Sequence, residues 1–323
     1  MQITRDKPMI WWWMLPVLLL AAGLAAQGLN QDALWYDEWW TVYTAGAAQY
    51  GPLSPVTILQ RIAEEDPVSP GPLYILLVAG WGALAGWHHA ALRALSLLCG
   101  LLTIAWTYRL GRDLASPLVG LAAGAVLASS AVFADYLHEL RAYSLLMLLV
   151  VVAVWAYWRL AAGKWSVWTA AALAASVTAT LYTHYLGGLL IAALAGYHLL
   201  AGRRRANWWR ITLLLALAGL LFLPWLPVPL LAATMTRVDA DRMTRVLSPA
   251  AVAQTLVHAF SGGSAALLAL FGVPGLVVSL RENGLRLAAV LVGATLALAL
   301  IANHYLMVKR KRIDAIGVAD ICP

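Results

Sequence analysis

The sequence predicts an all-α fold: a polytopic membrane helix bundle of about nine transmembrane helices, with juxtamembrane helices in the first external loop. Three observations lead to this prediction. Of the 323 residues, 62% are hydrophobic and only 11% are charged, whereas a soluble domain usually carries about 25% charged residues. Apolar runs of spanning length recur along the chain. Lys and Arg fall mostly in the short segments between them, a pattern that reflects membrane topology rather than nucleic-acid binding.

Nine apolar runs have spanning length, because a spanning helix needs about 20 residues and shorter ones are tolerated. They lie near 9–26, 91–108, 117–134, 142–158, 166–182, 185–201, 211–231, 264–280 and 287–306. The first run is longer than the apolar core of a signal peptide, about 7–15 residues, which favours an uncleaved helix. Many of the 16 Trp residues stand at the ends of runs, where amphipathic rings favour the membrane interface.

A tenth apolar run, Gly71–Trp87, decides the topology. If it lies in the interface and the N-terminus is cytoplasmic, twelve cations fall inside: Arg5, Lys7, Arg109, Arg112, Arg159, Lys164, Arg203, Arg204, Arg205, Arg210, Arg281 and Arg286. Six fall outside before the tail: Arg61, Arg93, Arg141, Arg237, Arg242 and Arg245. A spanning Gly71–Trp87 would instead place the basic 203–210 segment outside, against the positive-inside rule. We therefore predict a juxtamembrane helix here.

This topology gives a transmembrane domain over residues 1–308 and a basic tail over 309–323. Its two long external loops are 27–90 and 232–263. In the first loop, Ala45–Gln49 and Thr57–Glu65 are predicted to be short helices, followed by a rigid Pro-rich turn. Two charged clusters, Asp37-Glu38 and Asp135–Arg141, fall on the same external face. The topology also leaves Lys309–Arg312 outside, which the positive-inside rule does not explain.

The first charged cluster lies among the aromatic residues of Trp35–Trp40. Adjacent residues on a helix diverge by about 100°, so Asp37 and Glu38 do not aim at one atom in the same way. One acid is expected to act while the other is held by a partner or orients the loop. A carboxylate beneath an apolar rim is a suitable general base for a hydroxyl group. The alternative is a pair of ordinary solvated loop acids.

The second cluster holds Asp135, His138, Glu139 and Arg141. On a helix, His138 would share a face with Asp135 and with Arg141. An arginine that opens a transmembrane helix suits a phosphate group, because the helix N-terminus adds positive potential beside the guanidinium. A snorkelling Arg141 that pairs with Glu139 at the interface fits the sequence equally well. His184 is either a donor to a phosphate oxygen or a plain loop histidine.

Several ordered blocks of the sequence are similar to those of a known family. They are Asp37-Glu38, Ser69–Tyr74, Arg93, Tyr136–Tyr143, Thr183–Tyr185 and Leu223–Pro227. In these blocks the chain resembles the polytopic GT-C glycosyltransferases of the family 39 group, which includes protein O-mannosyltransferases, aminoarabinose transferases and RgtA/B/C/D-like enzymes. Gly71 and Pro70 depart from the usual Pro and His of their block. The chain is also short for this group, and its basic tail is expected to be truncated relative to it.

The resemblance implies a hexosyl- or pentosyltransferase that moves a sugar from a polyprenyl-phosphate donor to an acceptor hydroxyl, with inversion. It implies Asp37 as the catalytic base supported by Glu38. Glu139, Arg141, His184 and Arg93 would bind the donor phosphate, and Asp135, His138, Tyr143 and Tyr74 would support them. Some relatives use a divalent cation, for which Asp37, Glu38 and Asp135 are the candidate ligands of Mg²⁺ or Mn²⁺.

The expected location is the bacterial cytoplasmic membrane, with the active site on the external, periplasmic face. The expected partners are the donor, the lipid bilayer and an acceptor glycan, lipid or protein; no nucleic acid is expected. Two other functions remain open on the sequence: a transporter or flippase for a lipid-linked precursor, and a binding protein without catalysis. A transporter predicts polar residues along a transmembrane path, whereas here the polar residues gather in one external layer.

Overall fold

The computed structural model describes residues 10–30, 33–47, 50–65, 71–201 and 207–235, together with residues 250, 254, 287 and 290–292. The elements defined within these ranges are helices, which confirms the predicted all-α fold. They are η1 (Ile10–Trp13), α1 (Met14–Gly28), α2 (Tyr36–Ala45), α3 (Pro55–Glu65), α4 (Pro72–Ala85), α5 (His89–Leu114), α6 (Pro117–Ala128), α7 (Ala131–His138), α8 (Tyr143–Ala161), α9 (Val167–Thr183), α10 (Gly187–Ala201), α11 (Trp208–Phe222) and α12 (Pro227–Met235).

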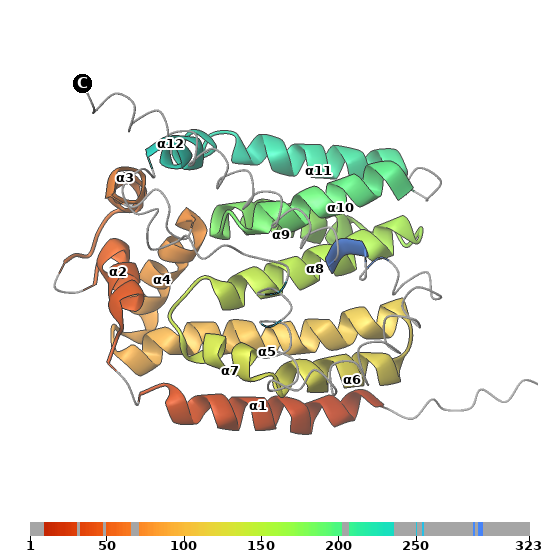
Figure 1. Cartoon of the computed structure of the whole chain (residues 1–323), viewed down its shortest axis with the longest axis horizontal. Coiled ribbons are helices and arrows are strands. Elements are labelled where there is room, and N and C mark those ends of the chain that lie inside the picture. The colour runs from red at the N-terminus through yellow and green to blue at the C-terminus, as the bar shows by residue number, and fades with distance from the viewer. Residues whose placement is uncertain are drawn as a thin grey trace, which may run out of the picture.

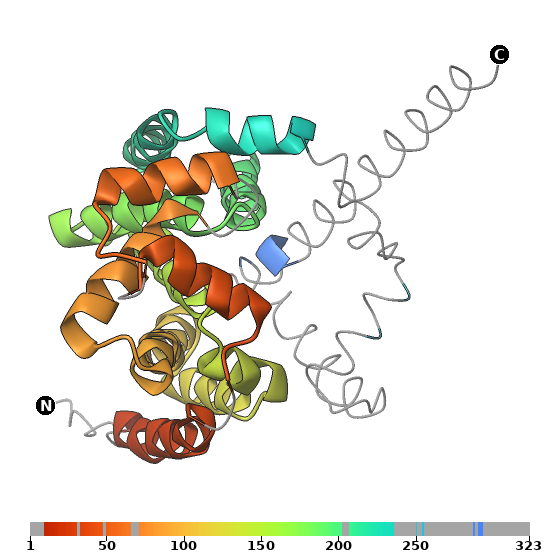
Figure 2. The same cartoon turned by 90° about the vertical axis from the view of Figure 1, so that its left-hand side faces the viewer.

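The long helices lie side by side, and the short ones gather at one end of them. Helices α1, α5, α6, α8, α9, α10 and α11 run lengthwise through the bundle (Figure 1). Helices α2, α3 and α4 cover one end, which faces the viewer in Figure 2. We call this the α2 end. It is the end where α1 finishes and α5 begins, because Arg93 near the start of α5 donates to the carbonyl of Leu29 after α1.

The opposite end of the bundle carries charges that the sequence places on the cytoplasmic side. Asp113, near the C-terminus of α5, pairs with Arg159 near the C-terminus of α8 at 3.2 Å. Its carboxylate also accepts a hydrogen bond of 2.9 Å from the indole of Trp155. A helix of 26 residues is about 39 Å long, so this group is separated by the length of α5 from the charges at the α2 end. The separation agrees with the predicted topology.

Helix α4 starts and ends at the α2 end of the bundle. The amide of Gly71, just before α4, donates to the carbonyl of Thr183 at the end of α9 (2.8 Å). After α4 the chain enters α5 directly, at the end where Arg93 meets Leu29. Both ends of α4 therefore lie on one side, and the helix does not cross the bundle. This is the arrangement predicted for the apolar run Gly71–Trp87.

Some predicted helices are broken or shifted. The run 117–134 forms α6 and α7, bent by 66° relative to each other, and the run 211–231 forms α11 and α12 with a turn between them. The short helix predicted at Ala45–Gln49 is wrong at Gly46 and Ala47, because α2 ends at Ala45 and Gly46 adopts a left-handed conformation (φ 79°); residues 48–49 lie outside the described ranges. The other short helix, predicted at Thr57–Glu65, is confirmed as α3.

By length and composition, two helices in the described part of the chain can cross a membrane, α5 and α8, or three if the bent pair α6–α7 is one span. Shorter apolar helices include α4, α9, α10 and α11. The count of nine is therefore not confirmed. The predicted runs 264–280 and 287–306, the loop 232–263 and the tail 309–323 lie outside the described residues, apart from a few single positions and the start of the loop at the end of α12.

An apolar cluster beneath the α2 end joins the short helices to the bundle. Ile58 and Ile62, one turn apart on α3, are each 1% exposed, and they belong to the same cluster as Val78 of α4 and Leu92 of α5. Burying each of these side chains contributes about 1.5–3 kcal/mol. The amphipathic α3 is thereby packed onto α4, and the two helices form the support on which α2 rests.

Gly71 is needed where α4 meets α9. A Cβ atom at this position would overlap the backbone carbonyl of Tyr182, and the hydrogen bond from Gly71 to Thr183 keeps the two backbones close. A backbone atom cannot move aside as a side chain can. The glycine in the Ser69–Tyr74 block therefore has a steric reason.

We predict that Gly71→Ala lowers the free energy of unfolding by about 1–3 kcal/mol, the usual cost of overpacking. The measurement is thermal unfolding of the purified protein in detergent. The control is Gly80→Ala within α4, where an added Cβ meets no atom within 4 Å. That variant should be as stable as the parent or slightly more so, since alanine favours helix. Equal stability of the two variants would contradict the proposed role of the close approach.

Candidate functional site

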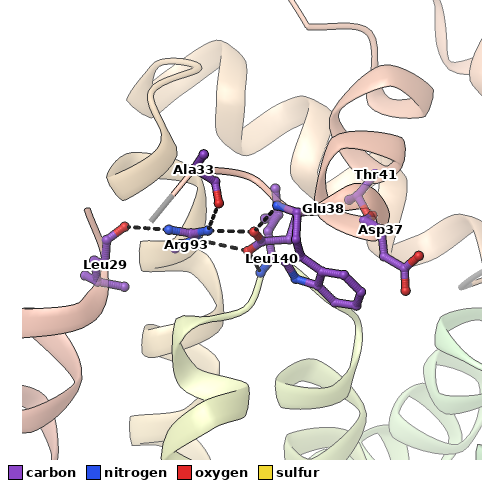
Figure 3. Close-up of polar contacts among 8 residues, drawn as sticks. Leu29, Ala33, Asp37, Glu38, Thr41, Arg93 and Leu140 are labelled. Carbon is purple, nitrogen blue, oxygen red and sulfur yellow. Dashed lines mark hydrogen bonds and ion pairs between the residues drawn. The ribbon is translucent and has the colours of Figure 1, made fainter. Parts of the chain in front are cut away.

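A buried ion pair lies at the α2 end. The carboxylate of Glu38 on α2 is fully buried, and Arg93 on α5 is 4% exposed. The guanidinium approaches in a bidentate manner, with Nε 2.9 Å from one carboxylate oxygen and Nη2 2.6 Å from the other (Figure 3). This fork geometry is among the stronger charge-assisted contacts in proteins. It joins two residues that are 55 positions apart in the chain and that lie on different helices.

The same pair gathers backbone groups from three further segments. Arg93 donates to the carbonyls of Leu29 and Ala33, each at 3.2 Å. Glu38 accepts from the amide of Leu140 at 2.7 Å and from that of Trp35 at 3.4 Å. A buried charge is tolerated only when it is paired and hydrogen-bonded. The end of α1, the start of α2 and the turn before α8 are consequently held around one carboxylate.

Asp37 points the other way. Its side chain is 38% exposed, and its carboxylate is directed away from Glu38 and Arg93 (Figure 3). Arg141 reaches it from the turn between α7 and α8, with Nη2 3.5 Å from the Asp37 carboxylate and Nη1 3.3 Å from its backbone carbonyl. The two charged clusters of the sequence therefore face each other, as predicted.

The rings of Tyr143 and His184 lie next to Arg141 and form one wall of the site with it. Its guanidinium lies 5.9 Å from the ring centroid of Tyr143, and that ring is 5.6 Å from the ring of His184. The Nδ1 atom of His184 accepts the amide hydrogen of Leu186 at 3.1 Å, which assigns the proton of the neutral ring to Nε2. Burial, together with the Arg141 charge, lowers the pKa of His184. At neutral pH this histidine is therefore an uncharged Nε2–H donor.

Glu139 lies beside the same arginine. Burial raises the pKa of its carboxyl, and the neighbouring acids Glu38, Asp135 and Asp37 raise it further, while Arg141 lowers it. The net effect is a raised pKa of Glu139. Glu139 therefore keeps its proton to higher pH than an ordinary glutamate, which limits the negative charge around Arg141.

The remaining predicted site residues have different surroundings. Tyr74 is 1% exposed and lies 3.5 Å from the hydroxyl of Ser96, which places it in the core beneath the site. Asp135 is exposed on α7. The Nε2 atom of His138 is buried without a hydrogen-bond partner in the described part of the protein. The prediction that His138 and Arg141 share a helix face is wrong, because α7 ends at His138 and Glu139 is extended.

The candidate metal ligands do not form a suitable set. Both oxygens of Glu38 are engaged by Arg93 and by backbone amides, and Asp37 faces Arg141. Within the described ranges, no three His, Cys, Asp or Glu side chains come together as metal ligands. The arginine partners already supply the positive charge that a cation would bring to these two acids. We therefore assign no residue of this cluster to a metal.

Two features of the site had no signal in the sequence. The amide of Leu140 holds Glu38, and the carbonyls of Leu29 and Ala33 hold Arg93. Every residue has these backbone groups, so no side-chain pattern reveals them. The aromatic residues around Asp37 are visible in the sequence, and the spacing of Tyr36, Trp39, Trp40 and Tyr43 puts them on one face because Tyr36–Ala45 is a helix.

A family model described as dolichyl-phosphate-mannose-protein mannosyltransferase matches residues 68–229, half of the chain. No curated protein matches the sequence. Among solved structures, ArnT from Cupriavidus metallidurans bound to undecaprenyl phosphate matches with a TM-score of 0.62 at 14% identity, covering 91% of this chain and 59% of its own. The apo state of ArnT from the same organism matches with a TM-score of 0.57 at 15% identity, covering 87% and 53%. The chain spans less than two thirds of either structure, and the likeness shows a common GT-C fold.

We predict that Glu38→Gln lowers the free energy of unfolding by about 3–5 kcal/mol, because it leaves the buried Arg93 without its counter-charge. Asp37→Asn should change stability by about 1 kcal/mol or less, since it removes only a partly exposed ion pair. Thermal unfolding in detergent compares these two neighbouring isosteric variants. Similar losses in both would show that the buried pair does not hold the α2 end together.

Proposed function

This chain belongs to the dolichyl-phosphate-mannose-protein mannosyltransferase family, and we propose that it is a membrane glycosyltransferase that uses a polyprenyl-phosphate-linked sugar as donor. It is an integral membrane protein of GT-C fold. ArnT, which shares this fold, has been solved with undecaprenyl phosphate, itself a polyprenyl phosphate, bound to it. These comparisons support a lipid-linked donor. The acceptor is proposed to be a hydroxyl group, and the anomeric carbon is proposed to be inverted.

One observation carries the proposal: a partly exposed carboxylate faces a group of cationic and hydrogen-bonding side chains at a single end of the bundle. Asp37 supplies the carboxylate, and Arg141 and His184 are those side chains. A transfer from a sugar phosphate to a hydroxyl needs both parts. The hydroxyl requires a base, and the departing phosphate requires positive charge and hydrogen-bond donors.

The proposed reaction is a single displacement at the anomeric carbon. The acceptor oxygen attacks the anomeric carbon while the bond from this carbon to the phosphate oxygen breaks on the opposite face. The acceptor proton passes to the carboxylate of Asp37, which is the general base. The electron pair of the broken bond leaves with the polyprenyl phosphate. Arg141 and the Nε2–H of His184 stabilise the charge that develops on this phosphate.

Arg141 has two roles in this scheme. In the structure it contacts Asp37 at 3.5 Å, a longer contact than the 2.6 Å of the buried Arg93–Glu38 pair. A donor phosphate competes for the same guanidinium, because Arg binds phosphate in a bidentate manner. Donor binding then draws Arg141 from the Asp37 carboxylate and leaves that carboxylate to the acceptor hydroxyl. Donor is therefore proposed to bind before acceptor.

Glu38 and Arg93 are assigned to positioning. The family resemblance implied that Glu38 supports the catalytic base and that Arg93 is among the ligands of the donor phosphate. In the structure the Arg93 guanidinium donates to Glu38 and to two backbone carbonyls, and both groups are buried. We propose that the pair fixes α2 so that Asp37 keeps its direction, while Tyr143 supports His184.

The proposed side of the membrane follows from the charges. The Arg112, Asp113 and Arg159 group lies at the end opposite to Asp37. Helix α11 starts at that same end, where Asn207 donates to the carbonyl of Leu160 near the C-terminus of α8, and the sequence just before Asn207 contains Arg203–Arg205. Cations in short loops face the cytoplasm. The α2 end is therefore proposed to face the outside of the cytoplasmic membrane. The polyprenyl chain of the donor is proposed to stay in the bilayer beside it.

We predict that Asp37→Asn lowers the rate of sugar transfer by about 10²–10⁴-fold, the usual contribution of a general base, while donor binding persists. The measurement is transfer from a panel of labelled polyprenyl-phosphate sugars by the purified protein in nanodiscs, with donor binding measured in parallel. Trp168→Ala, on an exposed position of α9, is the control and should keep full activity.

The outcomes separate the parts of the proposal. Donor binding without turnover in the parent protein would contradict the enzymatic function and favour a transporter or binding protein. Equal turnover of parent and Asp37→Asn would contradict only the assignment of the base.

A second prediction concerns pH. The pKa of Glu139 is raised, so its carboxylate appears only as the pH rises above the ordinary range for glutamate, and the new charge repels the donor phosphate. Donor affinity should therefore fall by about tenfold with rising pH, a repulsion on the order of 1 kcal/mol. Glu139→Gln should remove this part of the dependence. His184 also loses its proton as the pH rises. The parent protein and Glu139→Gln both contain His184, Glu38, Asp37, Asp135 and Arg141, so the difference between their two pH profiles reports on Glu139. Parallel pH profiles of donor affinity would refute the role of Glu139.

A further inference from the structure

One side of α2 is lined with aromatic rings. We call Tyr36, Trp39, Trp40 and Tyr43 the α2 aromatic face. Tyr36 stacks on Trp40 with ring centroids 6.4 Å apart, and Trp39 stacks on Tyr43 at 5.5 Å with 10° between the planes. Tyr50 closes the group, with its edge against Tyr43 at 5.1 Å and against Trp39 at 6.1 Å. The rings form one connected platform.

The platform adjoins the proposed catalytic base. With 100° between successive residues of a helix, the four rings fall within an arc of about 100°. Asp37 lies about 60° beyond Trp40 around the helix axis, and Glu38 lies on the side of the helix opposite to the rings. This agrees with the structure, where Glu38 is buried while Tyr36 is 72% and Trp39 is 38% exposed. A molecule lying on the rings is therefore next to Asp37.

The platform is held in place by α3. Arg61 donates to the backbone carbonyl of Tyr43 at 2.9 Å, and its guanidinium lies 4.3 Å above the Tyr43 ring. It also faces Glu65 at 3.7 Å. The arginine thus fixes the C-terminal end of α2, while Glu38 fixes its N-terminal end. The rings are ordered before any ligand arrives, which reduces the entropic cost of binding.

The chemistry of the platform suits a sugar ring. Sugars present faces of C–H groups that pack on aromatic rings, and edges of hydroxyls that need polar partners. The charged groups of Asp37, which is 38% exposed, and of Arg61, which lies over the Tyr43 ring, border the rings and are suitable polar partners. Insertion of the platform into hydrocarbon would instead carry the charges of Asp37 and Arg141 toward the membrane interior, at a cost of several kcal/mol.

We propose that the α2 aromatic face binds a sugar ring of the acceptor, so that the acceptor is a glycan. The inference rests on the proposed glycosyltransferase function and adds the acceptor class to it. The sugar stacks on Tyr36 and Trp39 and directs one hydroxyl to the carboxylate of Asp37. The donor phosphate is held from the other side by Arg141 and His184.

The test is a transfer assay with the full chain in nanodiscs and labelled polyprenyl-phosphate sugars. Three acceptor probes are compared: an equimolar mixture of mannotriose, maltotriose and chitotriose; a peptide rich in Ser and Thr; and a long-chain alcohol in the bilayer. We expect transfer to the trisaccharides. Trp39→Ala should raise the acceptor KM about tenfold, while kcat and the donor KM stay within about twofold.

Further variants keep the test independent of folding. Tyr36→Ala changes the most exposed ring and should raise the acceptor KM in the same way, and Trp39→Phe should restore most of the loss. Trp168→Ala, which removes an exposed tryptophan (82%) at the other end of the bundle, should leave the acceptor KM unchanged.

Each result decides between the claims. Transfer to the peptide or the alcohol but to no trisaccharide would overturn the glycan acceptor and leave the proposed function standing. A fall in kcat, or an equal rise of donor and acceptor KM in Trp39→Ala and Tyr36→Ala, would show that the rings only order α2 and would likewise overturn the inference. Transfer to none of the probes would overturn the proposed function, and with it this inference.

Discussion

The rest of the α2 end depends on the buried pair of Glu38 and Arg93. A carboxylate with no exposure to water requires a counter-charge and several hydrogen bonds, since an unpaired buried charge costs many kcal/mol. These partners come from α5, from the turn before α8 and from the start of α2 itself. None of these segments can move away without leaving a charged or polar group unsatisfied. The position of α2 follows from this requirement.

The adjacent acids Asp37 and Glu38 have different surroundings, one partly exposed and the other buried. Consecutive residues on a helix point in different directions, so if Glu38 is turned into the protein, Asp37 is turned toward its edge. The sequence alone predicts that one acid is held and that the other is free to act. It does not predict which one, because the choice depends on the position of Arg93, and 55 residues separate Arg93 from Glu38. The resemblance to a known family favoured Asp37 as the base, and the geometry is compatible with that assignment.

The sequence predicts which apolar run does not cross the bundle better than it predicts helix boundaries. Counting cations on either side of Gly71–Trp87 correctly indicated that α4 does not cross the bundle, because the bias of Lys and Arg is a sum over many loops. The break between α6 and α7, and the extended Glu139 that separates His138 from Arg141, are local changes of the backbone over one or a few residues. Hydropathy does not detect them. The contacts of Glu38 and Arg93 with backbone groups cannot be predicted from the sequence either, because backbone carbonyls and amides occur all along the chain.

The helix that carries the proposed base also carries the aromatic platform, and this has a mechanical consequence. Any shift of α2 moves Asp37 and the rings together, so the relation between base and acceptor is preserved. The position of α2 relative to Arg141 and His184 depends on two other contacts. The amide of Leu140 donates to Glu38, and the guanidinium of Arg141 pairs with Asp37. Leu140 and Arg141 are neighbours in one short turn. The backbone of this turn is tied to the buried acid, while its arginine side chain is proposed to exchange the partly exposed acid for the donor phosphate. The pair of acids and the turn thus combine a fixed scaffold with one contact that is proposed to move when the donor binds.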